Sequence, residues 1–222
     1  LEMYSDRLVG NTAGLLVKKG SYSDFDSIIQ AVQNNEITMG YTNPQTSSTG
    51  MNMLLSILNS GDQDNLFSDK AIENFKSFQQ NIPFVAYNTM QMRDSAQKGT
   101  LDGMILEYQT YVNEPNLNKM YDFIPFGVRH DNPLYVVNED YLSDEEIEAI
   151  GIFNDYCMSS SSQSIATKYG FNANDDYSTD MKFAGSEVNR ALEIYKSYKD
   201  NGKDIIAVFV ADCSGSMYGD PI

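Results

Sequence analysis

The predicted fold rests on a unit that reads Ile37-Thr38-Met39-Gly40-Tyr41-Thr42-Asn43-Pro44-Gln45-Thr46-Ser47-Ser48-Thr49-Gly50. Its first five residues have the composition of a short strand, and a polar loop runs from Asn43 to Gly50. Apolar residues then recur at the spacing of one helix face, as Met51, Leu54, Leu55 and Leu58. Because a strand that leads through a short loop into a helix is the repeating unit of α/β proteins, the sequence predicts an α/β fold.

Strand and helix patterns continue to alternate on both sides of this unit. Upstream, a strand is predicted over 12–17, and a helix follows from an N-cap at Ser23 or Asp24. Downstream, the patterns predict a helix over 72–79, a strand over 82–87, a helix over 90–97 and a strand over 101–107. The order β-α-β-α-α-β-α-β predicts a mainly parallel sheet with helices on both faces.

The pattern changes near Phe123. Extended segments are predicted over 123–129 and 133–137, with a turn at the proline between them. A capping box at Ser143 and Glu146 then begins a helix. The apolar face of this helix is predicted to be buried and comprises Ile147, Ile150, Phe153 and Cys157.

Two more helices are predicted toward the C-terminus. One ends at Tyr169, where Gly170 can adopt the left-handed conformation that often follows a helix. The other spans 186–200, and the polar residues 172–185 form a loop between the two.

Composition limits the classes of function. The chain has 222 residues, of which 41% are hydrophobic, so it can form one or two globular domains. Its formal net charge of -16 argues against nucleic acid and against docking on an anionic membrane surface. A membrane association is therefore expected only through an anchor outside this sequence. The two cysteines, Cys157 and Cys213, are predicted to be free thiols.

The Ser/Thr-rich loop is the strongest candidate for a ligand site. Four hydroxyl side chains gather where the helix begins, namely Thr46, Ser47, Ser48 and Thr49. The first turn of a helix has unpaired N–H groups and a partial positive charge, so such a cluster can hold an anion without Arg or Lys. The alternative is N-capping alone, which needs only one hydroxyl.

Two further strand ends could face the same cleft, because ligands of open α/β sheets lie beyond the carboxyl ends of the strands. Asn88, Thr89 and Arg93 follow one strand, although Arg93 can equally be a solvated helical residue. Glu107 and Tyr108 close another strand. Glu107 would repel a bare anion and favour an amine or a sugar hydroxyl. Alternatively, Glu107 is a carboxylate at the rim of the cleft that pairs with Arg93 or Lys98 and contacts no ligand.

The sequence offers little for catalysis. His130 is the only histidine, and its neighbour Asp131 should point to the opposite face of an extended segment. We therefore expect His130 to be structural or interfacial. A nucleophile, a base and oxyanion donors are not found together in any motif, so an enzyme is not expected.

The last twenty residues carry a separate motif. An apolar strand pattern over 204–211 runs into Asp212, Ser214 and Ser216, whose oxygens suit Mg²⁺, Ca²⁺ or Mn²⁺. This start resembles the metal-dependent adhesion site of von Willebrand factor type A domains. The Thr and second Asp of that site have no counterpart in this sequence, which implies that an ion would be weakly held or absent.

The remaining motifs resemble the extracellular solute-binding proteins of type 2 periplasmic-binding topology, near the molybdate, sulfate and phosphate binders. The resemblance is carried by the segment 40–50 and by Ser159…Gln163…Lys168-Tyr169-Gly170-Phe171. It implies two lobes, with the N-terminal part of lobe one missing from this sequence. The expected units are a hinge over 1–14, lobe two over 15–122, a returning lobe-one segment over 123–172, a linker and helix over 173–202, and the start of a von Willebrand A domain over 203–222.

The resemblance implies a non-enzymatic binding module on a bacterial cell surface. It would bind a small solute, with anions among the candidates, at the Ser/Thr-rich helix start and would be attached to the adhesion-type domain. The alternative is an adhesin in which this fold is only a platform for a protein or peptide partner. Both alternatives place the chain outside the cytoplasm.

Overall fold

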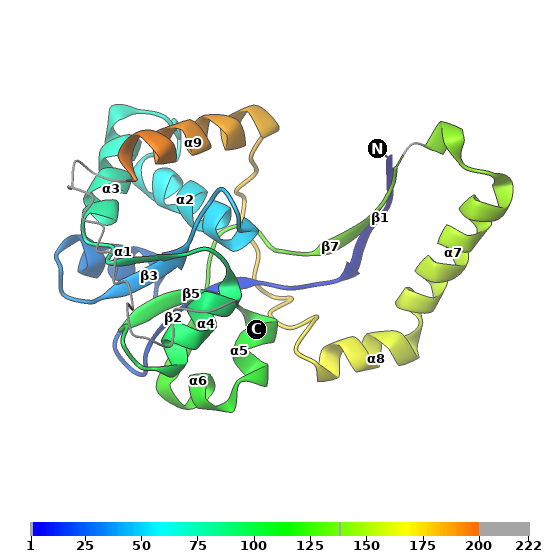
Figure 1. Ribbon diagram of the computed structural model, residues 1–222, viewed down its shortest axis with the longest axis horizontal. Coiled ribbons are helices and arrows are strands. Elements are labelled where there is room, and N and C mark those ends of the chain that lie inside the picture. The colour runs from blue at the N-terminus through cyan, green and yellow to red at the C-terminus, as the bar shows by residue number, and fades with distance from the viewer. Residues whose placement is uncertain (1, 138, 200–222) are drawn as a thin grey trace, which may run out of the picture.

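The computed structural model describes residues 2–137 and 139–199. Figure 1 shows two parts of unequal size. The larger part is an α/β lobe around a five-stranded sheet, and the smaller part is a two-stranded ribbon that carries two helices. The α/β class predicted from the alternating patterns is confirmed.

The sheet of the larger lobe has the strand order β4-β3-β5-β2-β6. Its strands are β2 (Ala13–Lys18), β3 (Met39–Thr42), β4 (Phe84–Ala86), β5 (Gly103–Glu107) and β6 (Tyr121–Pro125). Strand β3 is parallel to β4 and β5, whereas β2 is antiparallel to β5 and β6. Four strands therefore share one direction and β2 opposes them. The predicted mainly parallel sheet is confirmed with this exception, because β2 enters directly from a crossover and no helix precedes it.

Helices cover both faces of this sheet, as predicted (Figure 1). One face carries α1 (Phe25–Gln33), α2 (Ser48–Gly61), α3 (Asp69–Gln80) and α9 (Gly185–Tyr198). The other carries α4 (Thr89–Gln97), α5 (Tyr108–Asn113) and α6 (Pro115–Met120). Strand β2 serves both cores, since Leu15 and Val17 face the first and Leu16 faces the second.

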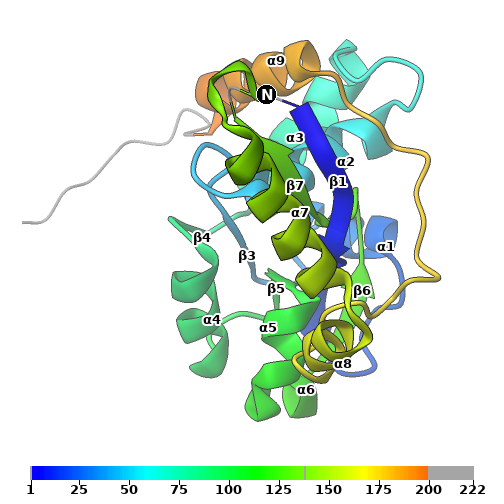
Figure 2. The same cartoon turned by 90° about the vertical axis from the view of Figure 1, so that its right-hand side faces the viewer.

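The smaller part is built on β1 (Glu2–Val9), which pairs antiparallel with β7 (Asn132–Val136). The 3-10 turn η1 (Glu139–Tyr141) leads from this ribbon to α7 (Asp144–Met158) and α8 (Ser160–Lys168). Figure 2 looks onto the ribbon and these two helices. The capping box predicted at the start of α7 is present, and the glycine after α8 is left-handed, with φ of 89°.

The predicted buried face of α7 is wrong. Phe153 is 50% exposed and Ile147 is 37% exposed, and α7 has no buried residue. The reason is that α7 packs against β1 and α8, and a ribbon of two strands is too narrow to cover a helix face. The thiol of Cys157 is free, as predicted, whereas Cys213 lies outside the described residues.

Three segments connect the two parts: residues 10–12, 126–131 and 169–184. The first is shorter than the predicted hinge over 1–14, because β1 already occupies 2–9. The third returns the chain to the larger lobe, where Ala191, Ile194 and Tyr195 of α9 are buried in the core. Within 2–137 and 139–199, every helix is too short or too polar to cross a membrane.

Candidate functional site

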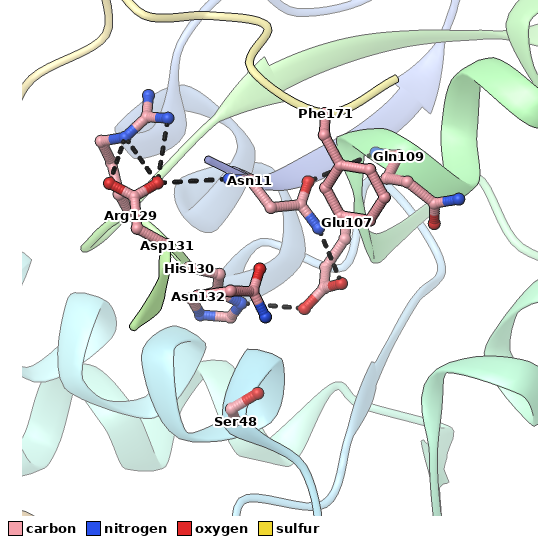
Figure 3. Close-up of a pocket in the computed structure, with 9 residues that line it drawn as sticks. All are labelled: Asn11, Ser48, Glu107, Gln109, Arg129, His130, Asp131, Asn132 and Phe171. Atoms are coloured by element: carbon pink, nitrogen blue, oxygen red, sulfur yellow. Dashed lines mark hydrogen bonds and ion pairs between the residues drawn. The ribbon is translucent and has the colours of Figure 1, made fainter. Parts of the chain in front are cut away.

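A cavity of about 460 Å³ lies where the crossovers meet the carboxyl end of β5 and the start of α2. Figure 3 shows the nine side chains around it. They are mostly polar and comprise Asn11, Ser48, Glu107, Gln109, Arg129, His130, Asp131, Asn132 and Phe171. Its place beyond the carboxyl end of a parallel strand is where open α/β sheets bind ligands.

Glu107 is the centre of a hydrogen-bond network in this cavity. Its Oε1 accepts from His130 Nδ1 at 3.0 Å and from Thr49 Oγ1 at 3.3 Å, and its Oε2 accepts from Asn11 Nδ2 at 3.0 Å. These bonds, led by that from His130, lower the pKa of Glu107 against the opposing effect of burial. Glu107 is thus a carboxylate that is held in place and remains 30% exposed at the cavity wall.

Asn52 fixes the hydrogen-bonding state of His130. Its Oδ1 accepts from Val128 N at 2.9 Å and its Nδ2 donates to Val128 O at 2.8 Å, which sets the orientation of the amide. The same Nδ2 lies 3.1 Å from His130 Nε2, so Nε2 must accept. In this arrangement Nδ1 donates to Glu107. Because Nε2 is occupied, His130 cannot serve as a base for Ser48 in this arrangement.

The cation that borders the cavity is neutralised by its neighbours. Arg129 Nε lies 3.1 and 3.2 Å from the two carboxylate oxygens of Asp131, and Arg129 Nη2 lies 3.3 Å from Asp175 Oδ1. Arg7 Nη2 donates to Asp175 Oδ1 at 2.6 Å. Arg129 also donates to Asn174 O at 2.8 Å. The guanidinium is therefore committed to contacts with Asp131 and with the segment 169–184 rather than to a ligand.

The hydroxyl cluster at the start of α2 divides by role. Ser48 is exposed and lines the cavity, whereas Thr49 is buried against Glu107. Ser47 is the N-cap, since its Oγ accepts from Gly50 N at 3.3 Å and also bonds to Thr42 Oγ1. Thr46 donates to Tyr87 O at 2.6 Å. The N-capping alternative holds for Ser47 only.

The structure does not bring the second predicted group to this cavity. Asn88 caps α4 by accepting from Gln91 N, and Thr89 is the first residue of that helix. Arg93 pairs with Asp94 at 3.1 Å and with Glu114 at 3.6 Å.

Tyr108 begins α5, and its ring packs on Phe123 with centroids 5.0 Å apart. The alternative prediction that Glu107 pairs with Arg93 or Lys98 is wrong. The crossover places His130 beside the end of β5 instead.

Sequence reasoning missed several cavity residues because they come from the crossovers. Asn11 and the run 129–131 are polar residues between strands, and Asn132 is the first residue of β7. The run of consecutive polar residues was the only sequence feature that could have indicated these cavity residues. Asp212, Ser214 and Ser216 lie outside the described residues, and the described part of the chain contains no cluster of His, Cys, Asp and Glu suited to a metal.

The sequence of the chain also matches a known protein family. The family model described as bacterial extracellular solute-binding protein matches residues 4–172. The chain belongs to this family. Its function is therefore solute binding, and its location is outside the cytoplasm. No curated protein sequence matches the chain.

Solved structures show the same fold. An extracellular solute-binding protein from Bordetella parapertussis has a TM-score of 0.64 at 11% identity, with 88% of this chain and 67% of that chain covered. The sulfate-binding protein SubI from Mycobacterium tuberculosis has a TM-score of 0.59 at 14% identity, with 89% of this chain and 67% of that chain covered. A periplasmic thiamin-binding protein has a TM-score of 0.58 at 12% identity, with 89% of this chain and 66% of that chain covered. The chain thus spans about two thirds of these proteins, and the likeness concerns the fold.

Proposed function

We propose that the cavity between Ser48 and Glu107 binds a small polar solute as the recognition step of a non-enzymatic receptor outside the cytoplasm. The supporting observation is the cavity itself, which combines an exposed hydroxyl at a helix start with a fixed carboxylate. Its volume of about 460 Å³ falls within the range of small-molecule sites, which is roughly 300–1,000 Å³.

The electrostatics of the cavity favour a solute with two kinds of polar group. The first turn of α2 offers the Ser48 hydroxyl and backbone N–H groups to a hydrogen-bond acceptor. Glu107 is held as a carboxylate and offers an acceptor to an ammonium or hydroxyl group. An inorganic dianion would meet the charge of Glu107 without a free cation from Arg129. We therefore place amines, amino acids and hydroxylated solutes ahead of bare oxyanions.

The arrangement also supports closure around the solute. The crossovers at 10–12 and 126–131 line the cavity and join its two sides, so a change in their backbone angles would open or close it. The proposal also includes attachment to a cell surface, which rests on the family resemblance. It includes a metal-dependent adhesion domain that begins at residue 203 and holds Mg²⁺, Ca²⁺ or Mn²⁺ at Asp212, Ser214 and Ser216, which rests on the sequence motif.

A thermal-shift screen of sulfate, phosphate, molybdate, amino acids, sugars and simple amines tests the proposal. A ligand at 100 times its dissociation constant should stabilise the fold by about 2.7 kcal/mol. Ser48→Ala should abolish the shift of a hit without lowering the melting temperature of the free protein. Ser47→Ala is the matched control, because loss of the N-cap should cost about 1 kcal/mol of stability while leaving binding in place. A screen without any shift would refute solute binding at this site.

A protein-binding platform is the second candidate. It is favoured by exposed apolar side chains on α7, on α8 and at the C-cap of α8, namely Ile152, Phe153, Tyr156, Met158, Ile165 and Tyr169. Surfaces of this kind mark contacts with other molecules more often than free solvent. Binding of a protein partner that is lost in Phe153→Ser, in a chain that gives no solute shift, would favour this candidate.

A further inference from the structure

We infer that the solute carries an apolar portion beside its polar head, and that this portion lies in a groove adjoining the polar cavity. The inference rests on the proposed function, because it concerns the same solute. It narrows the solute to amphipathic molecules, such as amino acids, amines or carboxylic acids with an aliphatic or aromatic substituent.

The groove has a volume of about 530 Å³ and lies between α2, the crossover 126–131, the segment that leads to α9 and the start of α9. Its walls are mainly apolar and are formed by Met51, Leu55, Val128, Met181, Phe183 and Val188. Met51, Phe183 and Val188 pack against the main core on one side and remain partly open on the other. The core therefore supports these apolar side chains on one side of the groove.

The groove and the polar cavity adjoin each other. Both are lined by Ser48 and His130, which stand at the junction between them. A molecule whose polar head bonds to Ser48 and Glu107 would thus direct a substituent past the edge of His130 into the apolar walls. A tetrahedral oxyanion would occupy the polar cavity alone and leave the groove empty.

Hydrogen bonds to backbone groups support the segments that line the groove. Tyr177 donates to Gly127 O at 2.8 Å, which ties the segment before Met181 to the crossover. Asn52 holds the backbone of Val128, the next residue of the same crossover. Two of the wall residues are methionines, whose flexible side chains adapt to substituents of different shape. A groove with a supported backbone and adaptable apolar side chains suits a set of solutes with related substituents better than one rigid solute.

Matched pairs of probes test the inference by isothermal titration calorimetry. Each pair shares a head group and differs in its substituent: glycine with leucine, methylamine with butylamine, and acetate with hexanoate. The inference expects the larger member of at least one pair to bind more tightly, by roughly fourfold for each buried methylene group. Equal affinities within every binding pair, or binding of sulfate alone, would overturn the inference and leave the proposed function intact. Absence of binding by every probe would overturn both.

Two nearly isosteric variants locate the apolar portion. Val188→Thr places a hydroxyl in the groove and should weaken the larger probe on the order of fivefold while leaving the smaller probe unchanged. Val137→Thr makes the same change at an exposed site away from the groove and should alter neither. Equal effects of the two variants on the larger probe would contradict the placement. Melting temperatures of both variants show whether Val188→Thr still folds, and Met181→Gln provides a second variant if it does not.

Discussion

The carboxylate of Glu107 and the imidazole of His130 lie 3.0 Å apart and tie the end of β5 to the second crossover. This contact joins two segments that are 23 positions apart in the sequence and that border the same cavity. Because Asn52 holds the other ring nitrogen, the pair is an ordered carboxylate–imidazole contact rather than a free acid and base. The cavity therefore keeps its shape and one negative charge before a solute arrives.

Acid should weaken the contribution of Glu107 to stability. Its pKa is lowered in the folded chain, so its contribution is fully present above the ordinary value of 4.5 and is lost as pH falls through the folded value. Urea unfolding of the wild type and Glu107→Gln at several pH values measures this. The advantage of the wild type should shrink as pH falls below about 4.5. An advantage that grows on acidification would refute this assignment.

Asn52 should be a principal support of the crossover. It is 2% exposed and bonds to both backbone groups of Val128 as well as to His130. Asn52→Ala leaves these groups without partners and should lower the free energy of unfolding by about 2–4 kcal/mol. Asn34→Ala is the control, since Asn34 is exposed and its side chain bonds only to Glu36 in the described contacts. Equal losses in the two variants would contradict the role of Asn52.

Gly127 should be irreplaceable in the same crossover. Its φ is 65°, and an added Cβ would lie 2.0 Å from Asn52 Oδ1. Gly20 has a φ of 72° with nothing within 4 Å of an added Cβ, so it provides a matched control. Gly20→Ala should cost about 1–2 kcal/mol for the left-handed backbone alone. Gly127→Ala should lower the free energy of unfolding clearly more than Gly20→Ala in the same urea titration. Equal losses would show that the crossover rearranges to accommodate the added methyl group.

Helix α9 should be part of the larger lobe rather than a linker. Ile194 is 9% exposed in the core, whereas Ile152 on α7 is 64% exposed. Ile194→Ala should cost about 2–5 kcal/mol of unfolding free energy, and Ile152→Ala should cost much less. Chemical denaturation measures both. Equal effects would mean that α9 does not stabilise the lobe in solution.

The sequence predicted the elements whose signal is local. Apolar periods located α1, α2 and α3, and the capping box located the start of α7. Strand β1 was not predicted, because its sequence EMYSDRLV does not alternate cleanly and its pairing with β7 joins distant segments. The buried face expected of α7 was wrong for a related reason. An apolar stripe indicates that a helix has a face to cover, but the covering surface depends on tertiary structure.

The candidate site was predictable only in part. The rule that ligands lie beyond strand ends identified Ser48 and Glu107 as neighbours of one cleft. The same rule also selected Asn88 and Arg93, since sequence does not tell which strand ends face the crossovers. His130 was expected to be structural, and its role depends on a contact that no local pattern contains.

The most direct test is to map a bound solute by ¹H–¹⁵N NMR of the labelled chain. The strongest hit from the solute screen is titrated, and the shift of each backbone amide is followed. We predict that the largest shifts belong to Ser48, Gln109 and His130, and that Ser48→Ala removes them. Largest shifts around the unrelated cavity lined by Gln33, Lys70 and Asn74 would contradict the proposed site.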